Sequence, residues 1–340
     1  MTAGPGCRLG AAQRLLLHFD IADRQQELRD SAAPDDFVLL RRDTPHHFPA
    51  GALAYCADLQ AERVHYTLHG AALPGLFAAP FLYSAQLTQA AGVVSVPFER
   101  LAELEAPHCA PCPTLIFSPG RTGSTLLAQL LLAAGAPCAS EPDMPTQICC
   151  FGREDRRRMG LDMEVALQRA CLVSLGRALG PAPFIKLRSH CNARPLPMME
   201  AAPGARAVFM LRRRDAWALS RHRTFGENPE SVAAVLREAA DALDKLGGAG
   251  VPFSVLWFED LVRDPAAVLR RLGVARVDEA AIARVLAQDA QAGTSIARER
   301  VASLAVDDGF QPAFDRAWAA ARQGAAWSES TQAHLLAMQA

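Results

Sequence analysis

The sequence predicts an α/β protein in which a parallel sheet of the phosphate-loop (P-loop) type is flanked by helices and follows a mixed α+β N-terminal region. Three observations predict this class. From residue 111 onward, strand-like and helix-like segments alternate, as they do in parallel sheets. A glycine-containing loop joins the first of these strands to an apolar helix. The first 110 residues mix both patterns without regular order, so we expect two domains, 1–110 and 111–340.

The N-terminal region is predicted to combine one helix with several short strands. Residues 11–30 have the apolar spacing of an amphipathic helix. Strand-like patterns bounded by turn residues follow at 36–40, 63–70, 81–87 and 92–98. The Pro-rich segment 106–113 then predicts the boundary between the two domains.

Alternation of strands and helices characterises the second domain. Strands are predicted at 114–118, 182–188, 205–212 and 252–260. Helices are predicted from the loop to about residue 135 and at 163–180, 216–225, 230–247 and 265–274, with a mostly helical tail from about residue 278. The apolar strands fit a sheet that helices cover on both faces.

The composition indicates a soluble globular protein. Half of the 340 residues are hydrophobic, which is enough for a substantial core. The formal net charge of −1 gives no overall attraction to nucleic acid or to acidic membranes. The N-terminus lacks the pattern of a secretory signal, and no apolar run approaches the ~18–20 residues of a membrane span. We therefore expect a cytoplasmic protein with no nucleic-acid partner and no membrane span.

The segment FSPGRTGSTLL has the pattern of an anion-binding loop. Free N–H groups in the first turn of the following helix, together with the helix dipole, attract an anion. Gly123 lets the backbone curve around the ligand, Ser124 and Thr125 supply hydroxyl donors, and Arg121 brings a positive charge. The ATP-binding pattern GxxxxGK[ST] is not met, because Arg121 and Thr122 precede the glycine and no Lys follows it.

A second basic pattern stands at the end of the strand 205–212. Arg212 ends this strand, and Ser220 follows eight residues later in the next helix. An Arg side chain forks two N–H bonds onto a phosphate, and the Ser hydroxyl adds another donor. Arg213 and Arg214 come next in the chain, so the pattern leaves open which arginine faces the ligand.

In these motifs the chain resembles the PAPS-dependent sulfotransferases, in particular the bacterial carbohydrate and lipid sulfotransferases; PAPS is 3′-phosphoadenosine-5′-phosphosulfate. RTGSTLL is similar to their 5′-phosphosulfate loop, with Arg in place of the commoner Lys, and Arg212 and Ser220 are similar to their 3′-phosphate pair. WFEDLVRDP, from Trp257, is similar to a structural turn of the family. The resemblance covers about residues 111–275. It implies metal-independent transfer of a sulfuryl group from PAPS to a hydroxyl or amine of a small-molecule, carbohydrate or lipid acceptor.

The resemblance also implies catalytic roles. Arg121 would hold the phosphosulfate, and Lys186, at the end of the strand 182–188, would reach the sulfuryl or bridging oxygen. Cytosolic members of the family place a catalytic His two residues after that Lys, where this chain has Arg188. Glu141 and His190 are the two alternative bases. Acceptor contacts are expected in the first 110 residues and in the segment 143–165.

Two other functions stay open at this point. A P-loop kinase or NTPase needs an Asp at a strand end to organise Mg²⁺. The strand 205–212 ends in Arg212 instead, which would repel a cation, whereas the strand 252–260 ends in Glu259 and Asp260. A non-catalytic nucleotide-binding protein is the other alternative.

Overall fold

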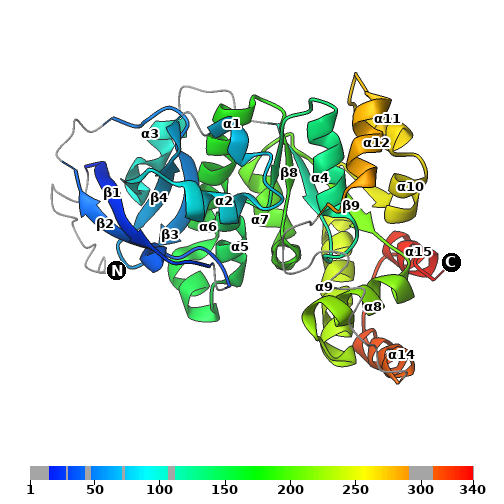
Figure 1. Cartoon of the computed structure of the whole chain (residues 1–340). Coiled ribbons are helices and arrows are strands. Elements are labelled where there is room, and N and C mark those ends of the chain that lie inside the picture. The colour runs from blue at the N-terminus through cyan, green and yellow to red at the C-terminus, as the bar shows by residue number, and fades with distance from the viewer. Residues whose placement is uncertain are drawn as a thin grey trace.

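The computed structural model describes residues 15–27, 30–42, 47–70, 73–105, 112–290 and 309–339. It contains two five-stranded sheets, one antiparallel and one parallel. Figure 1 shows the antiparallel sheet in blue at the N-terminal end of the molecule, and the parallel sheet with its helices in the green to red remainder. The predicted boundary segment 106–113 lies largely outside the described residues, so the division at residue 110 stays a prediction.

The N-terminal region forms the antiparallel sheet, with the strand order β2-β1-β5-β4-β3. Its strands are β1 (Leu17–Arg24), β2 (Phe37–Arg41), β3 (Leu53–Asp58), β4 (Arg63–Leu68) and β5 (Gly92–Pro97). The helices of this region are α1 (Leu73–Leu76), α2 (Leu82–Gln89) and α3 (Leu101–Glu105). The predicted strands at 36–40, 63–70 and 92–98 are confirmed as β2, β4 and β5.

Two predictions for this region are wrong. The described part of the segment 11–30 contains strand β1 rather than a helix, because β1 pairs with β2 on one side and with β5 on the other. These ladders satisfy the backbone of β1, so tertiary pairing overrides the local apolar spacing. The segment 81–87, predicted as a strand, lies mostly in helix α2, whose buried face includes Leu82, Ala85 and Gln86.

The edge strand β3 is covered by side chains of two helices from later in the chain, α5 (Asp143–Cys150) and α6 (Arg153–Leu179). The Gln147 side chain accepts a hydrogen bond from the Ala57 amide at 2.8 Å and donates one to the Ala57 carbonyl at 2.9 Å. The Ala54 amide donates to the Ser174 hydroxyl at 3.1 Å. These bonds satisfy backbone groups of an edge strand that would otherwise be open to pairing, and they fix the N-terminal sheet to the rest of the chain.

The second sheet is parallel, as the sequence predicts, and has the strand order β10-β9-β6-β8-β7. Its strands are β6 (Thr114–Phe117), β7 (Cys138–Ser140), β8 (Phe184–Lys186), β9 (Arg206–Leu211) and β10 (Phe253–Trp257). The ladders between these strands are parallel. The α/β fold class is therefore confirmed. In this sheet the sequence analysis did not predict the short strand β7, and in the N-terminal sheet it did not predict β3.

Helices cover both faces of this sheet, and successive strand residues alternate between the faces. In β6, Leu115 and Phe117 join one hydrophobic cluster with α6 and α9, whereas Ile116 joins a second cluster with α4. The remaining helices are α4 (Ser124–Ala133), α7 (Pro195–Ala201), α8 (Arg214–Phe225), α9 (Pro229–Gly248), α10 (Phe258–Arg263), α11 (Pro265–Arg271), α12 (Glu279–Ala287), α14 (Phe310–Ala321) and α15 (Glu329–Ala337).

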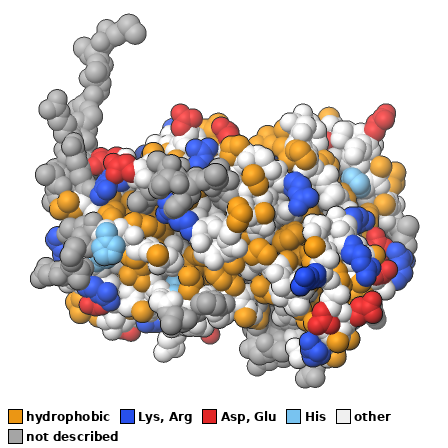
Figure 2. All heavy atoms as spheres, turned by 90° about the horizontal axis from the view of Figure 1, so that it is seen from above, with side chains coloured by type: hydrophobic (Ala, Val, Ile, Leu, Met, Phe, Trp, Pro, Cys, Tyr) orange, Lys and Arg blue, Asp and Glu red, His pale blue; other side chains and the backbone are white. Residues whose placement is uncertain are grey.

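The larger cluster joins the two sheets into one core. It contains Leu53 and Val94 of the antiparallel sheet together with Ile185 and Phe209 of the parallel sheet. On the surface, Figure 2 shows hydrophobic side chains over a broad part of the middle of one face, with Lys and Arg side chains more frequent toward its right. Within the described ranges, none of the helices is both long and apolar enough to cross a membrane.

Candidate active site

The predicted anion loop connects the end of β6 to the start of α4. Gly123 is the N-cap of α4 and has a φ of 79°, and Arg121 has a φ of 57°. Such positive φ values favour glycine, so Arg121 is held in a conformation that non-glycine residues seldom adopt. A β-carbon at position 123 would stand 2.4 Å from the Phe258 ring. The glycine is therefore required both by its φ and by this close approach.

Four successive carbonyl groups of the loop are held by side chains from elsewhere in the chain. Asn192 Nδ2 donates to the Ser118 carbonyl at 2.9 Å, and Arg221 Nη1 donates to the Pro119 carbonyl at 2.7 Å. Trp217 Nε1 donates to the Gly120 carbonyl at 2.8 Å, and Arg212 Nη1 donates to the Arg121 carbonyl at 3.3 Å. These bonds occupy the carbonyl oxygens of residues 118–121. The first amide groups of α4 have no side-chain cap, so the loop keeps donors for a ligand.

The residues of the two predicted phosphate motifs lie together. Arg121 Nε donates to the Ser220 hydroxyl of α8 at 3.2 Å. The Arg212 guanidinium lies 4.6 Å from the centroid of the Phe258 ring. Its Nε is buried and has no hydrogen-bond partner among the described residues. Thr122, in the same loop, is fully buried and also has an unpartnered hydroxyl there.

Three arginines, Arg121, Arg212 and Arg221, lie close together at this end of the site, each with a carboxylate nearby. Burial lowers the pKa of Arg121 and the nearby charge of Arg212 lowers it further, whereas the charge of Asp289 opposes these effects. Burial likewise lowers the pKa of Arg212, although Glu259 opposes that effect. Guanidinium groups in this position repel one another, and a bound anion relieves that repulsion.

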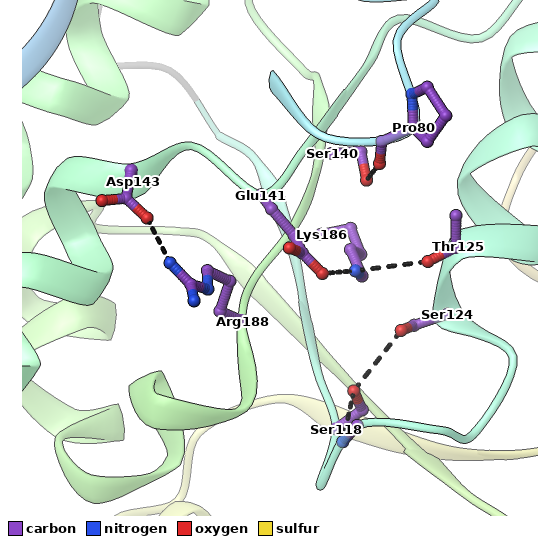
Figure 3. A network of polar contacts seen from close by, with 10 residues as sticks. Pro80, Ser118, Ser124, Thr125, Ser140, Glu141, Asp143, Lys186 and Arg188 are labelled. Atoms are coloured by element: carbon purple, nitrogen blue, oxygen red, sulfur yellow. Dashed lines mark hydrogen bonds and ion pairs between the residues drawn. The ribbon is translucent and has the colours of Figure 1, made fainter. Parts of the chain in front are cut away.

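Lys186, Glu141 and Thr125 meet at the end of β8 (Figure 3). The Lys186 ammonium is 3.4 Å from the Thr125 hydroxyl, to which it donates, and it forms an ion pair with Glu141. Glu141 follows β7 with a φ of 57°, and its amide donates to the Lys186 carbonyl at 2.7 Å. The backbone thus fixes the candidate base and the candidate cation relative to each other.

His190, the alternative base, and Arg188, which stands where cytosolic sulfotransferases have their catalytic His, are placed differently. Arg188, at the position of the family's catalytic His, forms an ion pair of 2.6 Å with Asp143, whose side chain is fully buried. Burial acts to lower the pKa of Arg188, but the charge of Asp143 and its hydrogen bond raise it overall. His190 is exposed at the rim of the site, in the 3-10 turn η5 (Ser189–Ala193). Burial of part of the ring lowers the pKa of His190, and the charges of Arg188 and Arg221 lower it further. The ring is therefore neutral at pH 7.

Most of these groups border one cavity of about 1270 Å³. Single small-molecule sites usually occupy about 300–1,000 Å³, so this cavity has room for more than one ligand. Its lining includes the predicted residues Arg121, Gly123, Ser124, Thr125, Glu141, Lys186, His190, Arg212 and Ser220. Of the predicted residues, Thr122 of the loop is buried and does not line the cavity.

Sequence reasoning missed several residues of the site. Trp217 and Arg221 lie on the face of α8 that also carries Ser220, and their spacing along that helix was a signal that could have revealed them. Phe258 and the cavity residues Phe81 and Tyr83 had no such signal, because the elements that carry them meet the loop only in the folded chain.

Glu259 and Asp260, predicted to end the strand 252–260, lie instead in the first turn of α10, which follows β10. Glu259 accepts a hydrogen bond from the Arg213 amide at 3.1 Å. Asp260 forms an ion pair with Arg263 one turn further along α10. Both carboxylates are therefore engaged by neighbouring donors, which weakens the alternative of a Mg²⁺ site built on this strand.

No protein-family model and no curated protein sequence matches the chain. Among solved structures, it is similar to the sulfotransferase domain of the olefin synthase from Synechococcus PCC 7002, with 20% identity and a TM-score of 0.40 over 64% of this chain and 96% of that one. It is also similar to a mouse sulfotransferase complexed with PAP, with 10% identity and a TM-score of 0.35 over 71% of this chain and 87% of that one. At these identities the likeness concerns the fold alone.

Proposed function

We propose that this protein is a PAPS-dependent sulfotransferase that transfers a sulfuryl group to a hydroxyl or amine without a metal ion. The observation that carries the proposal is the position of the Lys186 ammonium on the Thr125 hydroxyl of the loop. In nucleotide triphosphatases the corresponding loop hydroxyl binds Mg²⁺. Here the ammonium of Lys186, paired with Glu141, stands at that hydroxyl and supplies positive charge where a Mg²⁺ ion would otherwise lie.

Two subsites in the same cavity fit the two charged ends of the donor. The loop amides and Arg121 suit the 5′-phosphosulfate, because N–H donors at a helix N-terminus bind anions. Arg212 and Ser220 suit the 3′-phosphate, and the unpartnered, buried Nε of Arg212 is a donor that such a phosphate would satisfy. A nucleotide without the 3′-phosphate would leave this donor unsatisfied.

The chemistry follows from the placement of Lys186 and Glu141. The acceptor oxygen forms a bond to sulfur while the bond from sulfur to the bridging phosphate oxygen breaks, which leaves 3′-phosphoadenosine 5′-phosphate (PAP). Lys186 and Arg121 stabilise the negative charge that develops on the departing oxygen. Glu141 takes the proton of the acceptor hydroxyl. The Lys186–Glu141 ion pair holds both groups at the same point of the cavity.

His190 is the second candidate for the base. Its neutral ring borders the same cavity, and its exposed position lets it reach an acceptor from the rim. Glu141 is preferred because the backbone of β7 and β8 fixes it beside Lys186, where charge develops.

The proposal is tested by binding and by transfer. We expect PAP to raise the Tm of the full chain in EDTA, and at ~100 times its Kd to stabilise the fold by ~2.7 kcal/mol. AMP should bind more weakly, and ATP should gain nothing from Mg²⁺. Incubation with ³⁵S-labelled PAPS and a mixture of hydroxyl acceptors should release PAP together with a labelled product. Stabilisation by ATP with Mg²⁺ but not by PAP would overturn the proposal.

A further inference from the structure

One wall of the cavity comes from the N-terminal region, which the family resemblance does not cover. Phe81 and Tyr83, at the start of α2, border the same cavity as Glu141 and Lys186. Building on the proposed function, we infer that Phe81 and Tyr83 form the acceptor wall and select an acceptor that carries its hydroxyl on a planar aromatic ring. The N-terminal region then determines acceptor specificity, whereas the parallel sheet binds the donor.

The wall is fixed to the catalytic groups by the backbone. The Ser140 hydroxyl donates to the Pro80 carbonyl at 2.7 Å, and Figure 3 shows this contact close to Glu141 and Lys186. The Tyr83 amide donates to the Glu141 carbonyl at 3.3 Å. Two hydrogen bonds thus join the start of α2 to Ser140 and Glu141. An acceptor that stacks on this wall is thereby brought beside the candidate base.

The chemistry of the wall suits a neutral, flat ring. The two side-chain rings are stacked, with 19° between their planes and 5.6 Å between their centroids. The Lys186 ammonium lies 5.8 Å from the Phe81 centroid, and the Arg188 guanidinium lies 5.0 Å from the Tyr83 centroid. Both cations are neutralised by carboxylates, those of Glu141 and Asp143. The wall therefore offers aromatic surface with little net charge, which favours stacking over the binding of an anionic acceptor.

An aromatic hydroxyl also suits the base. A phenolic hydroxyl has a pKa of about 10, so a carboxylate removes its proton far more readily than that of an aliphatic alcohol. Burial, with a contribution from Glu141, raises the pKa of Tyr83 to about 12, so the Tyr83 hydroxyl stays protonated. Within the described part of the chain this hydroxyl forms no hydrogen bond, so it is available as a donor to the acceptor.

The test measures acceptor binding to the wild-type protein saturated with PAP, with 4-methylphenol, cyclohexanol and methyl glucoside as probes. We expect 4-methylphenol to bind at least about tenfold more tightly than either other probe, as judged by saturation-transfer NMR titration. In the double variant Phe81→Leu/Tyr83→Leu its affinity should fall about tenfold or more, while the Kd of PAP stays within about twofold. Tyr83→Phe retains the ring and should keep stacking. Phe19→Leu, on β1 and away from the cavity, is the matched control.

Equal or tighter binding of the sugar or the aliphatic alcohol would overturn this inference, and so would unchanged phenol binding in the double variant or no acceptor binding at all. The PAP titration distinguishes a failure of the proposed function from a failure of the acceptor inference. If PAP does not bind the wild-type protein, the proposed function fails. If PAP binds and the phenol preference is missing, the acceptor inference alone fails.

Discussion

The ring of Phe258 lies where a side chain on residue 123 would begin: Phe258 Cδ2 is 2.4 Å from the position of a β-carbon on Gly123. The same ring faces the Arg212 guanidinium, 4.6 Å from its centroid. Phe258 therefore packs against both the backbone of the anion loop and the arginine proposed to bind the 3′-phosphate. This one ring thus contacts both proposed phosphate subsites.

A first prediction follows for Gly123→Ala. The new methyl group meets the Phe258 ring, and alanine at a φ of 79° adds backbone strain of about 1–2 kcal/mol. Gly135→Ala is the matched control, since Gly135 has a φ of 73° but no atom within 4 Å of its built β-carbon. Urea denaturation should show a larger loss of the free energy of unfolding for Gly123→Ala. Equal losses in the two variants would contradict the packing role of Phe258.

The second prediction concerns the 3′-phosphate. Arg212→Ala should weaken PAP binding about tenfold or more, because a charge-assisted hydrogen bond is worth ~1.5–3 kcal/mol. The Kd of AMP, which lacks the 3′-phosphate, should change little. Arg214 forms ion pairs with Asp215 and Asp315, so Arg214→Ala serves as a control with the same loss of charge. Isothermal titration calorimetry with both nucleotides measures the two Kd values. If Arg213→Ala or Arg214→Ala, rather than Arg212→Ala, abolishes the preference for PAP over AMP, the 3′-phosphate subsite lies at that other arginine.

The third prediction assigns the base. Glu141→Gln retains the shape of the side chain and removes its basicity, so turnover with a hydroxyl acceptor should fall about 10²–10⁴-fold. The Kd of PAP should be retained, since Glu141 does not belong to the proposed donor subsites. His190→Asn, assayed in parallel, should keep most of the turnover. A collapse in His190→Asn with near-normal turnover in Glu141→Gln would transfer the role to His190.

The fourth prediction concerns stability in acid. Burial lowers the pKa of His69 to about 4 from its ordinary 6.5, and the ring is hydrogen-bonded to Thr67 at 2.9 Å. Between these two pH values the unfolded chain binds a proton that the folded chain does not. The contribution of His69 is therefore complete above pH 6.5 and is lost as the pH falls toward 4, by about 3 kcal/mol in total. Urea denaturation of wild type and His69→Gln across this range should show the extra acid sensitivity in the wild type only.

The sequence predicted that the loop, Arg212 and Ser220 lie near one another, because they stand at or just after the ends of strands whose apolar runs are clear in the sequence; their role in binding a donor stays a prediction. The loop, Arg212 and Ser220 all border one cavity, as expected from the edge at which parallel strands end. The helix predicted over 11–30 failed because β1 depends on ladders with β2 and β5 that no local pattern specifies. For the same reason, the buried Asp143 as the partner of Arg188 and the wall formed by Phe81 and Tyr83 could not be foreseen. Their roles depend on tertiary contacts between segments far apart in the chain.

The four hydrogen bonds that hold the loop carbonyls come from η5, from α8 and from the residue that follows β9. The loop's shape is consequently a property of the assembled fold, and a peptide that spans only β6 and α4 would lack every one of these donors. Transplanting the RTGSTLL segment into another α/β scaffold would carry over the glycine and the hydroxyls but not the geometry. Affinity for PAP would then serve as a reporter of whether α8 and η5 are correctly docked, even in variants altered far from the loop.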